Sequence, residues 1–416
     1  MRRILASILA AALLLGLTGC APSATQGTAE LWADGAAERP EATGLATSLT
    51  LKSGSKQEMR GVWVSFLEFY NLVKGDFREN VENLLDNARN LGLNTVFVQV
   101  RPYSDAMYKS KYFPWSHVLT GEQGKNPGYD PLQIFIEEGH ERGMEVHAWI
   151  NPYRITDSGA WELDDKNPAV KLQKQGDDLV LASGSGLYYN PARSVVQSLV
   201  IKGVLEIVEN YDVDGIHFDD YFYPTQDPSF DEAAYEELGD GKTLAEFRRY
   251  QVNKLIYNTY RAIKQKDSKV VFGISPAADI DKNMNEMYSD VKRWGSRSGY
   301  VDYLCPQIYF GFEHNKLPFD ETAKAWNDLV TSPSVDLYIG LAAYKAGLED
   351  AYAGDEGKSE WQENDDMLVR QIKYARNLRR CRGFALYRYE SIFAPSKEAA
   401  KVVLKEKARL QKLLAD

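Results

Sequence analysis

Two adjacent carboxylates, Asp219 and Asp220, end a short β-rich run and precede a group of aromatic residues. Side chains alternate along a strand, so His217 and Asp219 are predicted to lie on the same side of it. A cation beside Asp219, such as Arg101 or Arg154, would keep its carboxylate ionised. An ionised carboxylate aimed at the anomeric carbon of a sugar can attack that carbon or stabilise the positive charge that develops there. The pattern therefore predicts cleavage of glycosidic bonds, with Asp219 as a catalytic residue.

Glycoside cleavage also needs a proton donor, and several acidic residues are candidates. Asp220 would face away from Asp219 in a straight strand, where it would form a structural ion pair, and it shares the site only if the strand bends. The rival donors lie at other predicted strand ends: Glu390, Glu68, Asp105 and Asp279. We therefore expect the catalytic group to comprise Asp219, Asp220 and Glu390, with the identity of the proton donor left open.

Other polar and aromatic side chains gather where predicted strands end. Aromatic residues make up 12% of the chain, and flat rings with a polar edge suit the faces of sugar rings as well as ordinary packing. The predicted substrate-binding residues are Arg101, Tyr103, His147, Asn151, Tyr153, Arg154, His217, Tyr221, Gln307, Tyr309 and Tyr344. The alternative is that these side chains only form packed hydrogen bonds that close one end of the fold.

The elements that must position these residues alternate between β-rich runs and amphipathic helices. The runs span residues 60–65, 94–101, 144–151, 215–219, 269–275, 303–308, 336–342 and 383–387. Eight such runs predict an α/β fold, a TIM (β/α)8 barrel. The alternative, a doubly wound open sheet, typically has a glycine-rich phosphate-binding turn after its first strand. Residues 61–70 contain no such turn, which disfavours that fold. Long connections follow the strands and short ones follow the helices, which predicts a site at the carboxyl ends of the strands.

The N-terminal residues resemble a lipoprotein signal. Arg2 and Arg3 precede an apolar run over residues 4–17, which is too short to span a bilayer, and Cys20 follows. We predict a signal peptide over 1–19, lipidation of Cys20, a flexible tether over 20–57 and the (β/α)8 domain over 58–416. The expected location is extracytoplasmic, with the lipid on Cys20 anchored in a bacterial membrane. A plain cleaved signal is the alternative.

Composition and motifs exclude several other classes. The chain of 416 residues has 49 basic and 59 acidic side chains, a formal charge of −10, and its basic residues form no runs, which argues against a nucleic-acid partner. His147, His217 and Asp219 could converge on a divalent ion, but residues 61–65 lack the His-x-His pattern of barrel amidohydrolases. We expect no metal and no cofactor. The oligomeric state is left open.

Long motifs resemble glycosyl-hydrolase-like family ten from about Met59 to about Phe393. They include Gly61-Val62-Trp63, residues 94–102, 143–154 and 211–224, Phe272-Gly273-Ile274-Ser275-Pro276 and Pro306-Gln307-Ile308-Tyr309. The resemblance implies a TIM-barrel hydrolase that acts on glycans, in some members the peptide-stripped strands of peptidoglycan. The expected partner is therefore an envelope polysaccharide or peptidoglycan glycan. A barrel that binds glycans without cleaving them is the alternative.

The fourth β-rich run is also similar to the fourth strand of the α-amylase superfamily. That similarity implies a nucleophile at Asp219, with His217 where those enzymes have arginine. Their acid follows the fifth strand, whereas here this run ends in Ser275-Pro276 without a carboxylate. The resemblance therefore leaves the acid unassigned.

Overall fold

The computed structural model describes residues 57–157, 162–176 and 178–415. The predicted signal peptide, Cys20 and all of the predicted tether except Gln57 lie outside the described residues. Among the described helices, none is long and apolar enough to cross a lipid bilayer.

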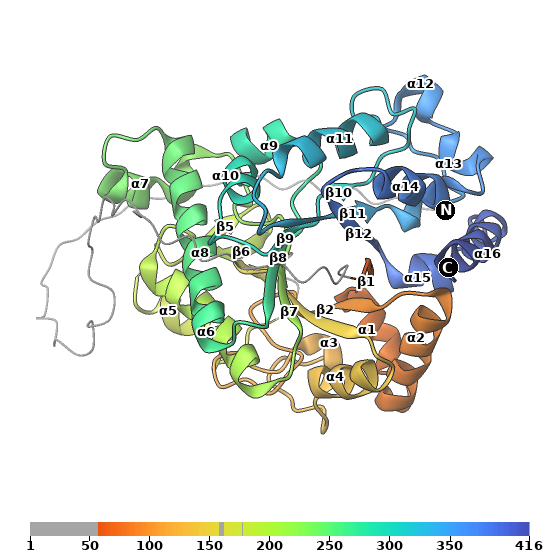
Figure 1. Ribbon diagram of the computed structural model, residues 1–416. Helices are drawn as coiled ribbons and strands as arrows, with labels where there is room; N and C mark the ends of the chain where they lie inside the picture. The colour runs from red at the N-terminus through yellow and green to blue at the C-terminus, as the bar shows by residue number, and fades with distance from the viewer. Residues whose placement is uncertain (1–56, 158–161, 177, 416) are drawn as a thin grey trace, which may run out of the picture. The chain divides into compact units, whose positions relative to one another are not determined.

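A closed barrel of parallel strands forms the centre of the fold (Figure 1). Its strands are β1 (Met59–Val64), β2 (Thr95–Arg101), β3 (Glu145–Ile150), β7 (Gly215–Phe218), β8 (Val271–Ile274), β9 (Tyr303–Leu304) with β10 (Gln307–Ile308), β11 (Asp336–Leu341) and β12 (Cys381–Leu386). β9 and β10 share the sixth position because Pro306, which has no N–H group, interrupts the strand. The barrel closes where β12 pairs with β1 and β11 pairs with β9. The predicted (β/α)8 barrel is confirmed.

Helices surround this barrel (Figure 1). The longer ones are α2 (Phe77–Leu91), α4 (Pro131–Glu141), α6 (Ser194–Asn210), α8 (Leu244–Lys266), α11 (Phe319–Leu329), α14 (Met367–Arg376) and α16 (Ala400–Leu414). Shorter ones are α1 (Phe66–Leu72), α3 (His117–Thr120), α5 (Pro168–Gln173), α7 (Glu232–Leu238), α9 (Ile280–Asn285), α10 (Val291–Ser296), α12 (Gly354–Gly357), α13 (Glu360–Glu363) and α15 (Tyr389–Phe393), with 3-10 turns η1 (Pro228–Asp231) and η2 (Ala343–Lys345).

Local sequence signals set where several helices begin and end. Thr243 and Glu246 form a capping box at the start of α8, and Asp130 caps α4 before its first proline. Gly92 ends α2 with a φ of 96°, a left-handed conformation that glycine adopts without steric strain. The Gly92 cap keeps the connection from α2 to β2 short, since β2 begins at Thr95.

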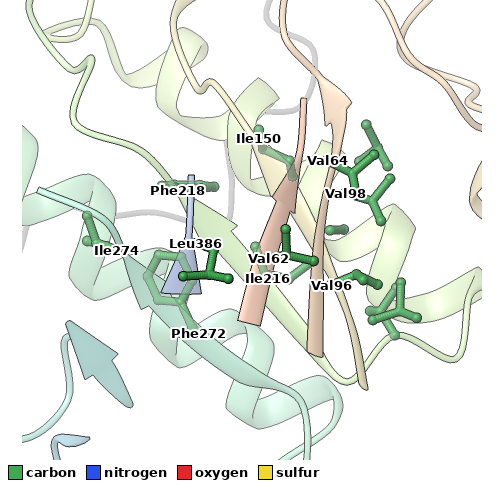
Figure 2. Packing of buried hydrophobic residues seen from close by; sticks show 14 of the residues in the cluster. Val62, Val64, Val96, Val98, Ile150, Ile216, Phe218, Phe272, Ile274 and Leu386 are labelled. Atoms are coloured by element: carbon green, nitrogen blue, oxygen red, sulfur yellow. The ribbon is translucent and has the colours of Figure 1, made fainter. Parts of the chain in front are cut away.

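The two faces of each barrel strand pack differently. Outward residues such as Val62, Val98 and Ile216 join the apolar layer between strands and helices (Figure 2). Inward residues form a separate cluster that fills the barrel: Met59, Trp63, Phe97, Trp149, Tyr303, Cys305 and Ala385. Alternation therefore fixes which side chains reach the interior, and the next inward residues beyond the strand ends surround the barrel's carboxyl-terminal opening.

A second, antiparallel sheet occupies the long connection after β3, which the sequence did not predict. It contains β4 (Arg154–Thr156), β5 (Val180–Ser183) and β6 (Gly186–Tyr189) in the order β4-β6-β5. Its first residue, Arg154, follows β3 by only four positions. The sheet therefore begins at the carboxyl-terminal end of the barrel.

Candidate active site

Asp219 directly follows β7 and is buried. Its Oδ2 accepts hydrogen bonds from the Asn151 side-chain amide and, at 3.4 Å, from the Trp149 indole N–H. Its Oδ1 accepts from the backbone N–H of Tyr221 at 3.3 Å. Burial raises the pKa of Asp219 to about 6, whereas the charge of Arg154 and these donors favour the ionised form. Asp219 is thus a buried carboxyl group surrounded by donors that suit its anion.

Asp220 is the second buried carboxyl group at this position. Burial and the neighbouring charge of Asp219 raise its pKa to about 7. Its Oδ1 is buried and has no hydrogen-bond partner among the described residues. Because β7 ends at Phe218, the chain no longer alternates strictly at Asp219 and Asp220, and the two carboxyl groups interact. The strand therefore bends as the sequence analysis required for Asp219 and Asp220 to share one site. The higher pKa of Asp220 makes it the more readily protonated of the two.

A hydrogen-bonded relay holds Asn151 in place. The Gln99 side-chain amide donates to Oδ1 of Asn151 at 2.7 Å, while its own Oε1 accepts from the backbone N–H of Phe66 at 2.9 Å. With its oxygen engaged by Gln99, Asn151 directs its NH2 group to Asp219. Gln99 and Trp149 were not in the predicted site. Their parity with Asn151 and Asp219 on neighbouring strands was the signal that could have included them.

Tyrosine rings gather around the two carboxyl groups. Tyr309 and Tyr387 stack with ring centroids 5.5 Å apart, and Tyr344 meets both edge-on, at 5.8 Å and 6.1 Å. Tyr387 interacts electrostatically with Asp219, as Tyr309 does with Asp220. Tyr221 interacts with both carboxylates and is 55% exposed. The predicted Tyr221, Tyr309 and Tyr344 thus lie near the carboxyl groups, and Tyr387 is an addition.

Arg154 is the cation beside Asp219. Its Nε donates to the backbone oxygen of Pro102 at 2.9 Å, and its guanidinium lies 4.6 Å from the ring centroid of Tyr103. The Tyr103 hydroxyl donates in turn to Asp157. Arg154 is therefore held in position by contacts other than Asp219, and its charge acts on that carboxylate across the site.

Comparison with known proteins assigns the family. Residues 58–354 match the family described as Glycosyl hydrolase-like 10. The chain belongs to this family.

Two curated relatives support that assignment. This glycosyl hydrolase-like 10 protein is 37% identical over 357 residues to the glycosyl hydrolase YngK of Bacillus subtilis strain 168, covering 79% of this chain and 68% of the relative. It is also 37% identical over 331 residues to the glycosyl hydrolase DigH of Escherichia coli strain K12, covering 70% and 75%.

Solved structures of low sequence identity share the fold. The PgaB (BpsB) glycoside hydrolase domain of Bordetella bronchiseptica is similar with a TM-score of 0.54 at 14% identity, over 83% of this chain and 98% of that domain. The catalytic domain of a β-amylase from Paenibacillus polymyxa gives a TM-score of 0.53 at 13% identity, over 85% and 98%. At these identities the likeness concerns the barrel fold.

Arg101 does not lie at this site of the glycosyl hydrolase-like 10 barrel, contrary to the prediction. The pairing of β2 with β3 shifts by one residue, so that Gln99 pairs with Trp149 but Arg101 pairs with Ile150. The extra residue is a β-bulge, and it turns Arg101 to the outer face. There its guanidinium lies 4.4 Å from the Phe113 ring centroid.

The predicted substrate contacts of His147 and His217 are also corrected. Both imidazoles approach the Tyr303 hydroxyl with Nδ1, at 3.1 Å and 2.9 Å, and His217 Nε2 accepts from Trp63 Nε1 at 3.2 Å. Burial lowers the pKa of His217 well below its usual value, so its ring is neutral. These rings fill the barrel interior as a polar network. Among the described residues, no three His, Cys, Asp or Glu side chains are grouped to hold a metal ion.

Three further predicted site residues lie at different places relative to the two carboxyl groups. Tyr153 is fully buried in the apolar layer around the barrel, and its hydroxyl has no partner among the described residues, so it does not line the site. Glu390 accepts from Asn71 at 2.6 Å and pairs with Arg388 at 3.1 Å, which engages its carboxylate away from Asp219. Gln307 is half-buried, donates to the Ser275 backbone oxygen at 3.0 Å and interacts with Asp220.

The other rival proton donors also have structural partners. Glu68 is buried, accepts from the Ser65 hydroxyl at 2.6 Å and pairs with Arg388. Asp105 binds His117 at 3.0 Å and Gln123 at 3.1 Å, and Asp279 caps α9. Asp219 and Asp220 are the pair that the structure brings together.

Proposed function

We propose that this protein is a membrane-anchored, extracytoplasmic glycoside hydrolase that cleaves a cell-envelope polysaccharide, with peptidoglycan glycan strands as the favoured substrate. The observation that carries the proposal is the pair of buried, interacting carboxyl groups Asp219 and Asp220 beside a cluster of tyrosines. Membership of a glycosyl hydrolase-like family and the names of the two relatives support the same reaction class.

The environments of the two carboxyl groups support distinct roles. Asp219 accepts hydrogen bonds from three donors and lies near a cation, so its anion can stabilise or attack the anomeric carbon. Asp220 retains its proton to a higher pH and can transfer it to the glycosidic oxygen as the bond from that oxygen to the anomeric carbon breaks. Water then supplies the new hydroxyl group at the anomeric carbon, and one of its protons returns to the carboxylate pair.

The proposed location rests on the sequence alone. Arg2 and Arg3, the apolar run over 4–17 and Cys20 have the order of a lipoprotein signal. Substituting Cys20→Ala is expected to move the protein from the membrane fraction to the soluble fraction of an envelope preparation. Retention of the Cys20→Ala protein in the membrane fraction would contradict the lipid anchor.

Asp219→Asn tests the proposed reaction. The wild-type domain is expected to release reducing ends from peptide-free peptidoglycan strands, and Asp219→Asn should lower that rate on the order of 10²–10⁴-fold while leaving binding of the strands largely intact. Asp212→Asn is the matched control, because its side chain is 95% exposed. A wild-type domain that binds these strands yet releases no reducing ends from any envelope glycan would support the non-catalytic binding barrel instead.

A further inference from the structure

A hollow lies between the small sheet and the loop that follows the two carboxyl groups. Its volume is about 360 Å³, within the roughly 300–1,000 Å³ of small-molecule sites. One wall is residues 181–184 of β5 and its turn, and the other is formed by Thr225, Asp227, Ser229 and Phe230. The second wall belongs to the same chain segment as Asp219 and Asp220, which are only a few residues earlier.

The register of the small sheet relates this hollow to the carboxyl groups. Arg154, whose charge acts on Asp219, pairs with Tyr188 of β6, and Tyr188 pairs with Leu181 of β5. Two strand spacings therefore separate Arg154 from the wall of the hollow, about 10 Å. One sugar ring at the carboxyl groups would not fill the hollow, whereas a chain of several sugars could reach both.

The chemistry of the walls suits a neutral, hydroxyl-rich ligand. β5 is an edge strand of its sheet, and no other described strand pairs with its second edge, so backbone N–H and C=O groups along that edge have no strand partner. The Ser183 hydroxyl makes no hydrogen bond to another described residue, and Phe230 supplies an aromatic ring. The lining contains the Asp227 carboxylate and no Lys or Arg, so within a glycan chain it favours an uncharged sugar over one that carries a carboxylate, such as muramic acid.

The loop wall is held in a fixed shape from behind. The buried Arg248 forms an ion pair with the buried Asp231 at 2.5 Å. Its guanidinium also donates to the backbone oxygens of Thr225 at 3.4 Å and Asp227 at 2.7 Å. A wall fixed in this way loses little conformational entropy when a ligand binds.

We infer that this hollow is a distal subsite that binds a sugar of the same glycan chain whose glycosidic bond lies at Asp219 and Asp220. The inference rests on the proposed function and adds to it that the protein selects long glycan chains. A ligand that contacts both places is bound more tightly than a short one, because the second contact is made within one molecule.

Two substitutions test the subsite without touching the carboxyl groups. Ala182→Ile fills the hollow at an exposed strand position that suits a β-branched residue, and Ser183→Ala removes the free hydroxyl. Ser185→Ala is the matched control, since Ser185 lies in the same hairpin turn, outside the lining, and donates to the Asp157 backbone oxygen. Peptide-free peptidoglycan oligosaccharides of two and eight sugars are the probes, with kcat/KM measured for cleavage and calorimetry on the Asp219→Asn background for binding.

The wild type should prefer the eight-sugar probe, and Ala182→Ile should reduce kcat/KM and affinity for it about tenfold while changing the two-sugar values little. Ser183→Ala should act in the same direction, and Ser185→Ala should not. Equal effects on both probes, or none, would overturn the subsite. If the wild type cleaves neither probe, the proposed hydrolase fails, while the calorimetric chain-length comparison still decides whether the hollow binds glycan.

Discussion

The side-chain amide of Asn151 donates a hydrogen bond to Oδ2 of Asp219, across two adjacent barrel strands. The strand register explains this contact. Ile150 of β3 pairs with Phe218 of β7, so the residues that follow them, Asn151 and Asp219, leave the barrel side by side. The contact thus follows from parallel pairing continued by one residue, and it joins the third and fourth barrel strands at the proposed reaction centre.

Asn151→Ala is expected to shift the acid side of the pH–rate profile to higher pH. The amide stabilises the ionised form of Asp219, so its loss raises the pKa of Asp219 above about 6 and moves the acid limb towards about pH 7. The measurement is kcat/KM against pH on glycan strands. Asn87→Ala, on an exposed face of α2, is the control. An unchanged acid limb in Asn151→Ala would show that Asp219 does not set it.

Asp220→Asn is expected to remove the alkaline limb of the same profile. Asp220 must keep its proton to act as an acid, so the wild-type rate should fall as pH rises through about 7, and the optimum should lie between about 6 and 7. The variant should lose most activity on glycan strands and much less on a nitrophenyl glycoside, whose leaving group needs no protonation. Equal losses on the two substrates would argue against an acid role for Asp220.

Substitutions of the two arginines predicted for the site should differ in their effect on kcat/KM. Arg154→Met removes the cation near Asp219, raises the pKa of Asp219 and should lower kcat/KM at pH 6 about tenfold. Arg101→Met should leave kcat/KM nearly unchanged, because Arg101 packs against Phe113 outside the barrel. Thermal unfolding of both variants separates folding from catalysis. A larger kinetic effect from Arg101→Met, with an unchanged melting temperature, would contradict this assignment.

The alternation of side chains along a strand does not predict where Arg101 and Asp220 lie. Eight strands, their inward faces and the position of Asp219 follow from residue periodicity, which the barrel preserves. A single inserted residue in β2 reverses the side of Arg101, and the end of β7 at Phe218 frees Asp220 from the strand's alternation. Neither irregularity leaves a signal in composition or spacing, because each depends on the pairing with the neighbouring strand.

Contacts between residues far apart in sequence were the other source of error in the predicted site. Glu390 follows the eighth strand within α15, yet Asn71 from the first connection and Arg388 engage its carboxylate, and Arg388 also pairs with Glu68. Tyr387 was overlooked because it is one aromatic among many in the sequence. Its stacking on Tyr309 depends on the arrangement of the strands, because β10 and β12 flank β11 on either side and their ends meet at the barrel opening.

Tyr303→Phe is expected to lower stability while leaving catalysis nearly intact. His217 is neutral and accepts from Trp63 at Nε2, so its proton is on Nδ1 and is donated to the Tyr303 hydroxyl. The hydroxyl proton is then donated to Nδ1 of His147. Removing the hydroxyl leaves two buried ring nitrogens without partners, which should lower the free energy of unfolding by about 2–3 kcal/mol.

Tyr338→Phe provides the matched control for that variant. Tyr338 packs against the same interior cluster, and its hydroxyl makes no hydrogen bond to the described part of the chain. Denaturant unfolding should therefore separate the two variants, with the larger loss in Tyr303→Phe, while kcat/KM at 25 °C stays within about threefold of the wild type in both. A Tyr303→Phe protein of normal stability but strongly reduced kcat/KM would instead place the two histidines in the reaction, because their hydrogen bonds would then serve the site and not the packing of the barrel.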